Sequence, residues 1–197
     1  MSDVVIIDSG GANLASLQYA LQRLGADSEV SSDPAVIRAA PHVLLPGVGA
    51  AADAMRRLQA AGLHQVIPQL RQPLLGICLG MQLLFTHSEE GDTPCLGVIA
   101  GSVRRLHGAP ERPVPHMGWN TLDILGTDPL LTGIGTTDHV YFVHSFAAPL
   151  LPATIAAVEY GGTLTAIVRH ENFCGVQFHP ERSARVGERL LRNFLEL

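Results

Sequence analysis

The segment that most constrains the fold is a short apolar run that ends in residues 76–80, Gly-Ile-Cys-Leu-Gly, and continues into Met-Gln-Leu-Leu-Phe. This pattern predicts a strand, a strained turn centred on Cys78 and then a helix, because the flanking glycines leave room for a sharp turn. Such a turn places the cysteine sulfur at the carboxyl edge of a sheet, beside the first turn of a helix. The helix dipole and free backbone N–H groups there favour the thiolate, which is the nucleophilic form. The pattern therefore indicates acyl-transfer chemistry.

A second interpretation of Cys78 stays open at this point. A cysteine in an apolar stretch is commonly a small buried hydrophobe whose thiol does not react. The flanking glycines and the abrupt change from strand to helix character favour the nucleophile. A base, an orienting group and an oxyanion site elsewhere in the chain are needed to decide between the two.

The first half of the chain alternates between strand and helix patterns. Strands are expected at residues 4–7, 28–31, 43–45 and 74–78. Helical spacing is expected at residues 14–24, 51–70 (broken at Gly62 and Pro68) and 79–87. Strands that repeatedly feed helices imply right-handed crossovers and a central parallel sheet.

The pattern changes after about residue 97. Shorter segments, expected to be mixed or antiparallel additions to the sheet, lie at residues 98–106, 139–146, 154–160, 165–168 and 175–178. Residues 185–197 are expected to form a closing amphipathic helix. The predicted fold is α/β, with a mostly parallel central sheet flanked by helices and antiparallel strands added in the second half.

Length and composition predict one domain that spans residues 1–197, since 47% of the residues are hydrophobic. No apolar run approaches the roughly 20 residues that a membrane-spanning helix needs, and no basic region precedes an apolar core near the N-terminus. We therefore expect a cytoplasmic protein with no membrane association. The three cysteines, Cys78, Cys95 and Cys174, are too scattered to suggest a disulfide framework.

The charged residues exclude several kinds of chemistry. A net charge of −5 with no basic stripe argues against a nucleic-acid partner. All 13 basic residues are arginines, so Schiff-base catalysis, a Ser–Lys dyad and a lysine-bearing phosphate loop are ruled out. The nine histidines and three cysteines lack C-x-x-C or H-x-x-x-H spacing, so neither a metal site nor a cofactor is predicted.

A candidate base for Cys78 is His179, which follows the apolar strand positions Val176 and Phe178. Pro180 favours an extended conformation at His179 and cannot easily continue a central strand, so the histidine is expected at a strand end. If the backbone stays extended through the proline, Glu181 faces the same side and can orient the imidazole ring. The alternative is a strand-end histidine beside a solvated glutamate.

A candidate oxyanion site is the turn at residues 46–49, Pro-Gly-Val-Gly, which follows the third predicted strand. Its glycines allow backbone N–H groups to turn towards a ligand. The second donor would be the N–H of Leu79, the residue after the candidate nucleophile. The alternative is an ordinary strand-to-helix turn.

Together these motifs resemble the class I, triad-type glutamine amidotransferases. The resemblance is more specific for the glutaminase subunits of imidazole glycerol phosphate synthase, in histidine biosynthesis. It rests on Pro-His-Met-Gly-Trp-Asn at 115–120, Tyr-Phe-Val-His-Ser at 141–145 and Gly-Val-Gln-Phe-His-Pro-Glu-Arg-Ser at 175–183. It extends from Val4 to the last predicted helix.

The resemblance implies a role for each matched residue. Cys78 would attack the carboxamide of L-glutamine to form a glutamyl thioester, His179 would relay protons and Glu181 would orient the histidine. The positions that would hold glutamine or line its pocket are Gln82, Glu90, Tyr141, His144 and Ser145. The oxyanion region would comprise Gly47, Val48, Gly49 and Leu79.

The resemblance also implies a heterodimer with a cyclase subunit, a (β/α)8 barrel that receives the ammonia. The products of that cyclase are imidazole glycerol phosphate and aminoimidazole carboxamide ribotide. Asn13, Trp119 and Arg182 would lie at the interface. A lone tryptophan is also commonly a core residue, and exposure on a flat face would favour docking over core packing.

The sequence departs from the family pattern at Ser9 and Ala12 in the first turn, where many relatives carry a tyrosine and a second glycine. It also departs at Ala51, where an aromatic residue is common, and at Arg182, where many relatives carry lysine. These differences affect the expected interface rather than the triad. The rival functions are another class I glutaminase, which should lack the 115–120 segment, and a catalytically silent interaction subunit, which should lack a triad residue.

Overall fold

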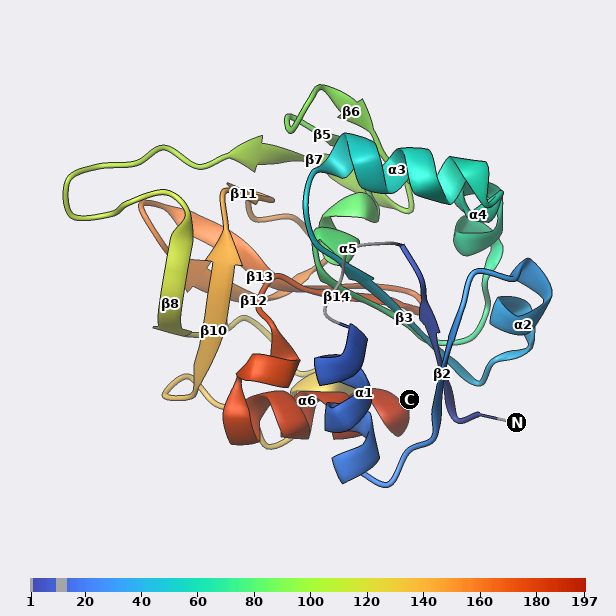
Figure 1. The fold of residues 1–197 in the computed structure, drawn as a ribbon. Helices are drawn as coiled ribbons and strands as arrows, with labels where there is room; N and C mark the ends of the chain where they lie inside the picture. The colour runs from blue at the N-terminus through green and yellow to red at the C-terminus, as the bar shows by residue number, and fades with distance from the viewer. Residues whose placement is uncertain (1, 10–13) are drawn as a thin grey trace.

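The structure, a computed structural model, describes residues 2–9 and 14–197. Its centre is an eight-stranded sheet (Figure 1). The strand order across this sheet is β2 (Ser28–Ser31), β1 (Val4–Ile7), β3 (His42–Gly47), β4 (Leu74–Cys78), β14 (Phe173–Val176), β13 (Thr163–His170), β12 (Thr154–Glu159) and β9 (Asp123–Ile124). Neighbours from β2 to β14 are parallel, and those from β14 to β9 are antiparallel. The predicted mostly parallel sheet with added antiparallel strands is confirmed.

Helices cover both faces of the sheet (Figure 1). One face carries α1 (Leu14–Arg23) and α6 (Ala184–Leu195), and the other carries α2 (Pro34–Ala39), α3 (Ala51–Ala60), α4 (Leu63–Val66) and the 3-10 turn η1 (Ile67–Gln69). Successive β1 side chains alternate between the two cores, with Ile6 on the α1 and α6 side and Ile7 on the α3 side. Burial on both faces explains why β1 is a continuous apolar run.

Two smaller sheets lie beside the main one. One comprises β11 (Phe146–Ala147), β7 (Ile99–Arg105), β5 (Phe85–Ser88) and β6 (Thr93–Pro94), and the other is a two-stranded ribbon of β8 (His116–Thr121) and β10 (His139–His144). The expectation that residues 98–106 and 139–146 extend the main sheet is therefore wrong. β3 and β14 occupy both edges of β4, whereas β7 pairs with β5 and β11, and β10 pairs with β8.

One predicted helix is shorter than expected, and one observed helix was not predicted. The helix expected at 79–87 ends early, as α5 (Leu79–Leu83), because fully buried Phe85 begins β5 and pairs with Ile99 of β7. Helix α2 was not predicted, although Pro34 occupies its first turn and Asp33 Oδ1 accepts a hydrogen bond from the Ala35 N–H at 2.8 Å. The remaining short turns are η2 (Pro129–Leu131) and η3 (Pro180–Arg182).

The topology brings three distant segments to one place. Strands β3, β4 and β14 are parallel neighbours, so their carboxyl ends meet at the same edge of the sheet. That edge carries residues 46–49, Cys78 and the segment leading to His179, which is where ligands bind in open α/β sheets. Over the described residues, no helix combines the length and apolar character needed to cross a membrane.

Candidate active site

Cys78 lies at the predicted strained turn between β4 and α5. Its backbone has φ 54° and ψ −111°, a conformation rare for a residue with a side chain. The turn packs tightly against neighbouring backbone: a Cβ atom on Gly80 would overlap the carbonyl oxygen of Leu45, and one on Gly76 would lie 2.7 Å from the carbonyl oxygen of Gly80. The two glycines are therefore required by space, and the prediction of a strand–turn–helix elbow is confirmed.

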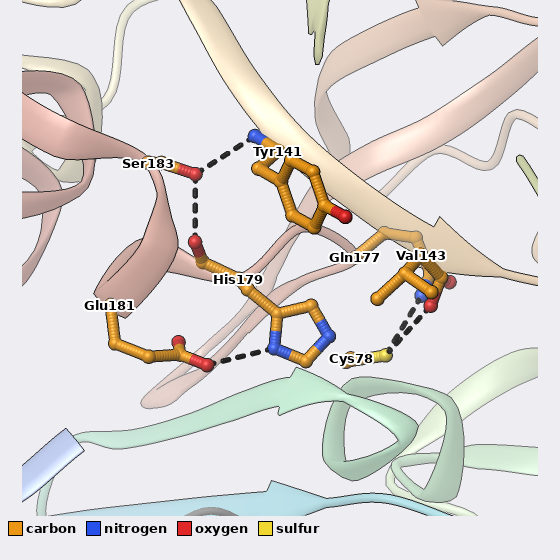
Figure 2. Close-up of polar contacts among 7 residues, drawn as sticks. All are labelled: Cys78, Tyr141, Val143, Gln177, His179, Glu181 and Ser183. Atoms are coloured by element: carbon orange, nitrogen blue, oxygen red, sulfur yellow. Dashed lines mark hydrogen bonds and ion pairs between the residues drawn. The ribbon is translucent and has the colours of Figure 1, made fainter. Parts of the chain in front are cut away.

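His179 and Glu181 form a hydrogen-bonded pair beside Cys78 (Figure 2). His179 Nδ1 lies 2.9 Å from Glu181 Oε1, as expected, but the path of the backbone differs from the prediction. His179 itself is extended, whereas Pro180 begins the 3-10 turn η3, so Glu181 folds back towards the ring rather than lying two residues along a strand. Because the carboxylate accepts the proton of Nδ1, the other ring nitrogen is left on the side of Cys78.

The sulfur of Cys78 is buried among polar groups from three segments. It lies 3.8 Å from the carbonyl oxygen of Val143 in β10 and 3.8 Å from Nε2 of Gln177, which follows β14. His179 forms the third side of this environment (Figure 2). Gln177 belongs to the motif at residues 175–183, but its contact with the sulfur is not visible in the sequence.

The surroundings of His179 favour its charged form. Burial alone would lower the pKa of this imidazole, but hydrogen bonds to Cys78 and Glu181, with the negative charges of both groups, raise it to about 10. At neutral pH the ring therefore carries two protons.

The main chain of His179 is fixed by β10 and by Ser183. The His179 N–H donates to the Tyr141 carbonyl at 3.0 Å. The fully buried hydroxyl of Ser183 donates to the His179 carbonyl at 2.7 Å and accepts from the Tyr141 N–H at 2.9 Å (Figure 2). Ser183 was not singled out from the sequence, although its place in the His-Pro-Glu-Arg-Ser motif was a possible signal.

A cavity of about 480 Å³ opens next to these groups. Its lining includes all three candidate triad residues and most of the predicted binding residues, namely Gly47, Val48, Gly49, Leu79, Gln82, Glu90, His144 and Ser145. Arg182 also lines it. The cavity therefore unites the three motifs that the sequence placed far apart.

Two of these lining residues are held by the protein itself. Gln82 Nε2 donates to the Phe146 carbonyl at 2.8 Å and to Gln177 Oε1 at 2.9 Å. Glu90 Oε2 accepts from the Ala51 N–H at the start of α3 at 2.8 Å. Both side chains are fixed in position before any ligand enters.

His144 has both ring nitrogens engaged with protein atoms. Nδ1 lies 2.9 Å from the Phe146 carbonyl and Nε2 lies 3.0 Å from Nδ1 of His116. A carbonyl only accepts, so His144 Nδ1 carries the proton and its Nε2 accepts from His116. Burial lowers the pKa of each histidine to about 4. His144 thus borders the cavity as a neutral ring, and its nitrogens bind protein rather than a ligand.

Tyr141 does not lie where it was expected. It is absent from the cavity lining among the described residues and packs instead with two of the predicted interface residues. The Arg182 guanidinium lies 4.5 Å from the centre of the Tyr141 ring, and Trp119 makes an edge contact with that ring at 5.8 Å. Asn13, the remaining interface candidate, lies outside the described residues. Nowhere in residues 2–9 and 14–197 do three His, Cys, Asp or Glu side chains form a group that could hold a metal ion.

Comparison with known proteins agrees with this geometry. The family described as glutamine amidotransferase class-I matches residues 5–197. The imidazole glycerol phosphate synthase subunit HisH of Xylella fastidiosa (strain Temecula1) is 55% identical to this chain and that of Xanthomonas axonopodis pv. citri is 53% identical, each over 100% of this chain and 98% of the relative.

A crystal structure of a glutamine amidotransferase superposes with a TM-score of 0.76 at 23% identity, covering 98% of this chain and 97% of that one. At this identity the likeness supports the fold alone. The match over residues 5–197 and the two full-length relatives show the family: the chain belongs to the class I glutamine amidotransferases, and among them to the family of the imidazole glycerol phosphate synthase subunit HisH.

Proposed function

We propose that this glutamine amidotransferase acts as a glutaminase through a triad of Cys78, His179 and Glu181, within a single domain that spans residues 1–197. The observation that carries the proposal is the strained Cys78 turn beside a histidine whose Nδ1 is held 2.9 Å from a glutamate. The substrate follows from the family, and the cavity beside Cys78 has room for a small amino acid.

The charge state of the triad sets the order of proton transfers. The Cys78 thiolate attacks the carboxamide carbon of glutamine, and the His179 imidazolium gives its proton to the departing nitrogen, which leaves as ammonia. The neutral imidazole then takes a proton from water, whose oxygen attacks the glutamyl thioester and releases glutamate. Glu181 keeps the ring oriented throughout.

The lining residues have complementary tasks in this mechanism. The N–H of Leu79 and the backbone of residues 46–49 would stabilise the negative oxygen that forms during each attack. Gln82, Glu90 and Ser145 would hold the amino-acid end of glutamine, while His144 would shape the pocket as a neutral ring. Tyr141 would act at the neighbouring surface, because its ring packs with Trp119 and Arg182.

The partner in this proposal is a cyclase subunit with a (β/α)8 barrel, and the complex acts in the cytoplasm in histidine biosynthesis. Support comes from the names of the full-length relatives and from the outer face of the β8–β10 ribbon. Trp119 is 53% exposed and Met117 is 66% exposed on neighbouring outward positions of β8. Exposed large apolar side chains of this kind are typical of a docking surface. Asn13 and Arg182 are proposed to complete it.

The triad is tested by Cys78→Ala. Ammonia release from glutamine should fall below detection, while unfolding behaviour and cyclase binding stay close to those of the unsubstituted chain. Cys95→Ala, at a half-buried thiol outside the cavity, serves as the matched control. Glutaminase activity that persists in Cys78→Ala would contradict the proposal.

The dependence on a partner is tested by ammonia release with and without the cyclase and its nucleotide ligand. The isolated chain should turn over slowly, since glycines at 47 and 49 leave the oxyanion segment able to change conformation and a bound partner can fix it. Full turnover by the isolated chain would overturn this coupling and leave the triad intact.

A further inference from the structure

The buried amide of Gln177 has no role in the mechanism above, although it touches the nucleophile. Its side chain is 0% exposed and lies between Cys78 and Gln82. Nε2 is 3.8 Å from the Cys78 sulfur, and Oε1 is 2.9 Å from Nε2 of Gln82. Figure 2 shows the Gln177 amide reaching the sulfur beside the Val143 carbonyl.

The orientation of this amide is fixed by a backbone carbonyl two contacts away. The Phe146 carbonyl can only accept, so the Gln82 atom 2.8 Å from it must be the NH2 group. The same NH2 group lies 2.9 Å from Gln177, which must therefore present its oxygen to Gln82 and its own NH2 group to Cys78. The Phe146 carbonyl thus fixes the orientation of the Gln82 amide and, through it, that of the Gln177 amide. As a result, the NH2 group of Gln177, a donor, faces the sulfur of Cys78.

The sulfur therefore lies between groups that favour opposite protonation states. The Val143 carbonyl accepts and so favours the thiol, whereas the Gln177 N–H donates and so favours the thiolate. His179, held by Glu181, also favours the thiolate. Without the Gln177 side chain, the His179 imidazolium alone would counter the effect of the Val143 carbonyl on the protonation state of Cys78.

We propose that Gln177 is a positioning residue that donates to the Cys78 thiolate, with the Phe146 carbonyl fixing the direction of that donation through Gln82. The proposal rests on the proposed function for the role of Cys78 as nucleophile. It also gives Gln82 a second task, since the same side chain borders the glutamine pocket and orients the amide behind the nucleophile.

The test is the pH dependence of Cys78 alkylation by iodoacetamide in the full chain, followed by mass analysis of the Cys78 peptide. Gln177→Met keeps the length of the side chain and removes the donor. It should raise the midpoint of the alkylation profile by about one pH unit. Gln82→Met, which frees the Gln177 amide to rotate, should shift the midpoint in the same direction by less.

The matched control is Gln72→Met, which removes a partly buried amide that donates to the Ile37 carbonyl outside the cavity. It should leave the midpoint unchanged. In ammonia release with the cyclase present, Gln177→Met should lower kcat about tenfold and keep KM within about twofold, because the donor acts on the nucleophile rather than on bound glutamine.

A midpoint for Gln177→Met within about 0.3 pH unit of the unsubstituted chain would overturn the proposal, as would an equal shift in Gln72→Met. If Gln177→Met does not fold, the Gln82→Met profile decides by the same criterion. Alkylation needs no glutamine turnover, so failure here is distinct from failure of the proposed function, which Cys78→Ala tests separately.

Discussion

Two buried histidines border the same cavity, yet their surroundings shift their pKa values in opposite directions. Burial lowers the pKa of His144 to about 4, although the hydrogen bond from its ring to the Phe146 carbonyl acts in the opposite sense. Burial acts in the same sense on His179, but contacts with Cys78 and Glu181 raise its pKa to about 10. Burial alone therefore does not decide charge in this site. The hydrogen bonds and charges around His179 raise its pKa, so the His179 ring can carry a proton while the buried His144 ring stays neutral.

The largest expected effect comes from removing the proton carrier. His179→Asn should lower ammonia release in the presence of the cyclase by about 10³-fold or more, because in the proposed mechanism His179 protonates the leaving nitrogen. His170→Asn, at an exposed histidine of β13, is the matched control and should keep the activity of the unsubstituted chain. Retention of more than about a tenth of the activity in His179→Asn would remove His179 from the mechanism.

A smaller effect is expected from removing the charge that orients His179. Glu181→Gln keeps the shape of the side chain but removes its negative charge. Glutamine turnover should therefore fall about 10²-fold. The pKa of His179 should fall at the same time, because one of the charges that raise it is gone. The measurement pairs steady-state kinetics with NMR titration of the ring, and unchanged values in both would show that Glu181 is a bystander.

The neutral histidine pair should make the fold sensitive to acid. The pKa values of His116 and His144 are about 4 in the folded chain against an ordinary value of 6.5. Their contribution to stability is therefore present above pH 6.5 and is lost as the pH falls towards 4, by about 1.4 kcal/mol per pH unit for each histidine. Urea unfolding at pH 7 and pH 5 measures this loss.

The same unfolding experiment on His116→Phe separates the pair from the rest of the chain. The substituted ring can still stack between Phe142 and Tyr160, but His144 Nε2 loses its donor, which should cost about 1–3 kcal/mol at pH 7. The loss of stability between pH 7 and pH 5 should then shrink, since one titrating group is gone. An unchanged pH dependence would show that other groups cause the acid sensitivity.

The smallest expected effect is at Ser183, which fixes the backbone rather than the charge of His179. Ser183→Ala leaves the His179 carbonyl and the Tyr141 N–H without this hydroxyl, at a cost of about 1–2 kcal/mol in the free energy of unfolding. Thermal or urea unfolding measures this cost. Turnover should change by less than in Glu181→Gln, and a larger loss of turnover would give Ser183 a more direct role.

The elbow could be predicted from the sequence because its causes are local. Residues 76–80 contain both the glycines that the turn requires and the cysteine that it displays. The His179–Glu181 contact was predicted with the wrong backbone, since the sequence does not show whether Pro180 continues a strand or begins a 3-10 turn. Helix α2 could have been found from Asp33 and Pro34, a recognisable start signal.

The remaining features depend on contacts between distant segments. The early end of α5 follows from pairing of β5 with β7, and the His116–His144 contact follows from pairing of β8 with β10. The position of Tyr141 beside Arg182 and Trp119, and the contact of Gln177 with Cys78, likewise require the assembled sheet. No periodicity in the sequence carries such information.

The most direct test of the contrast between the two histidines is an NMR titration of the His179 ring in the unsubstituted chain and in Cys78→Ala. In the unsubstituted chain the ring should stay doubly protonated through pH 8, with a midpoint near the raised pKa of about 10. In Cys78→Ala the midpoint should move down, because the hydrogen bond and charge of the sulfur are removed. A midpoint near 6.5 in the unsubstituted chain would contradict the thiolate–imidazolium pair on which the mechanism depends.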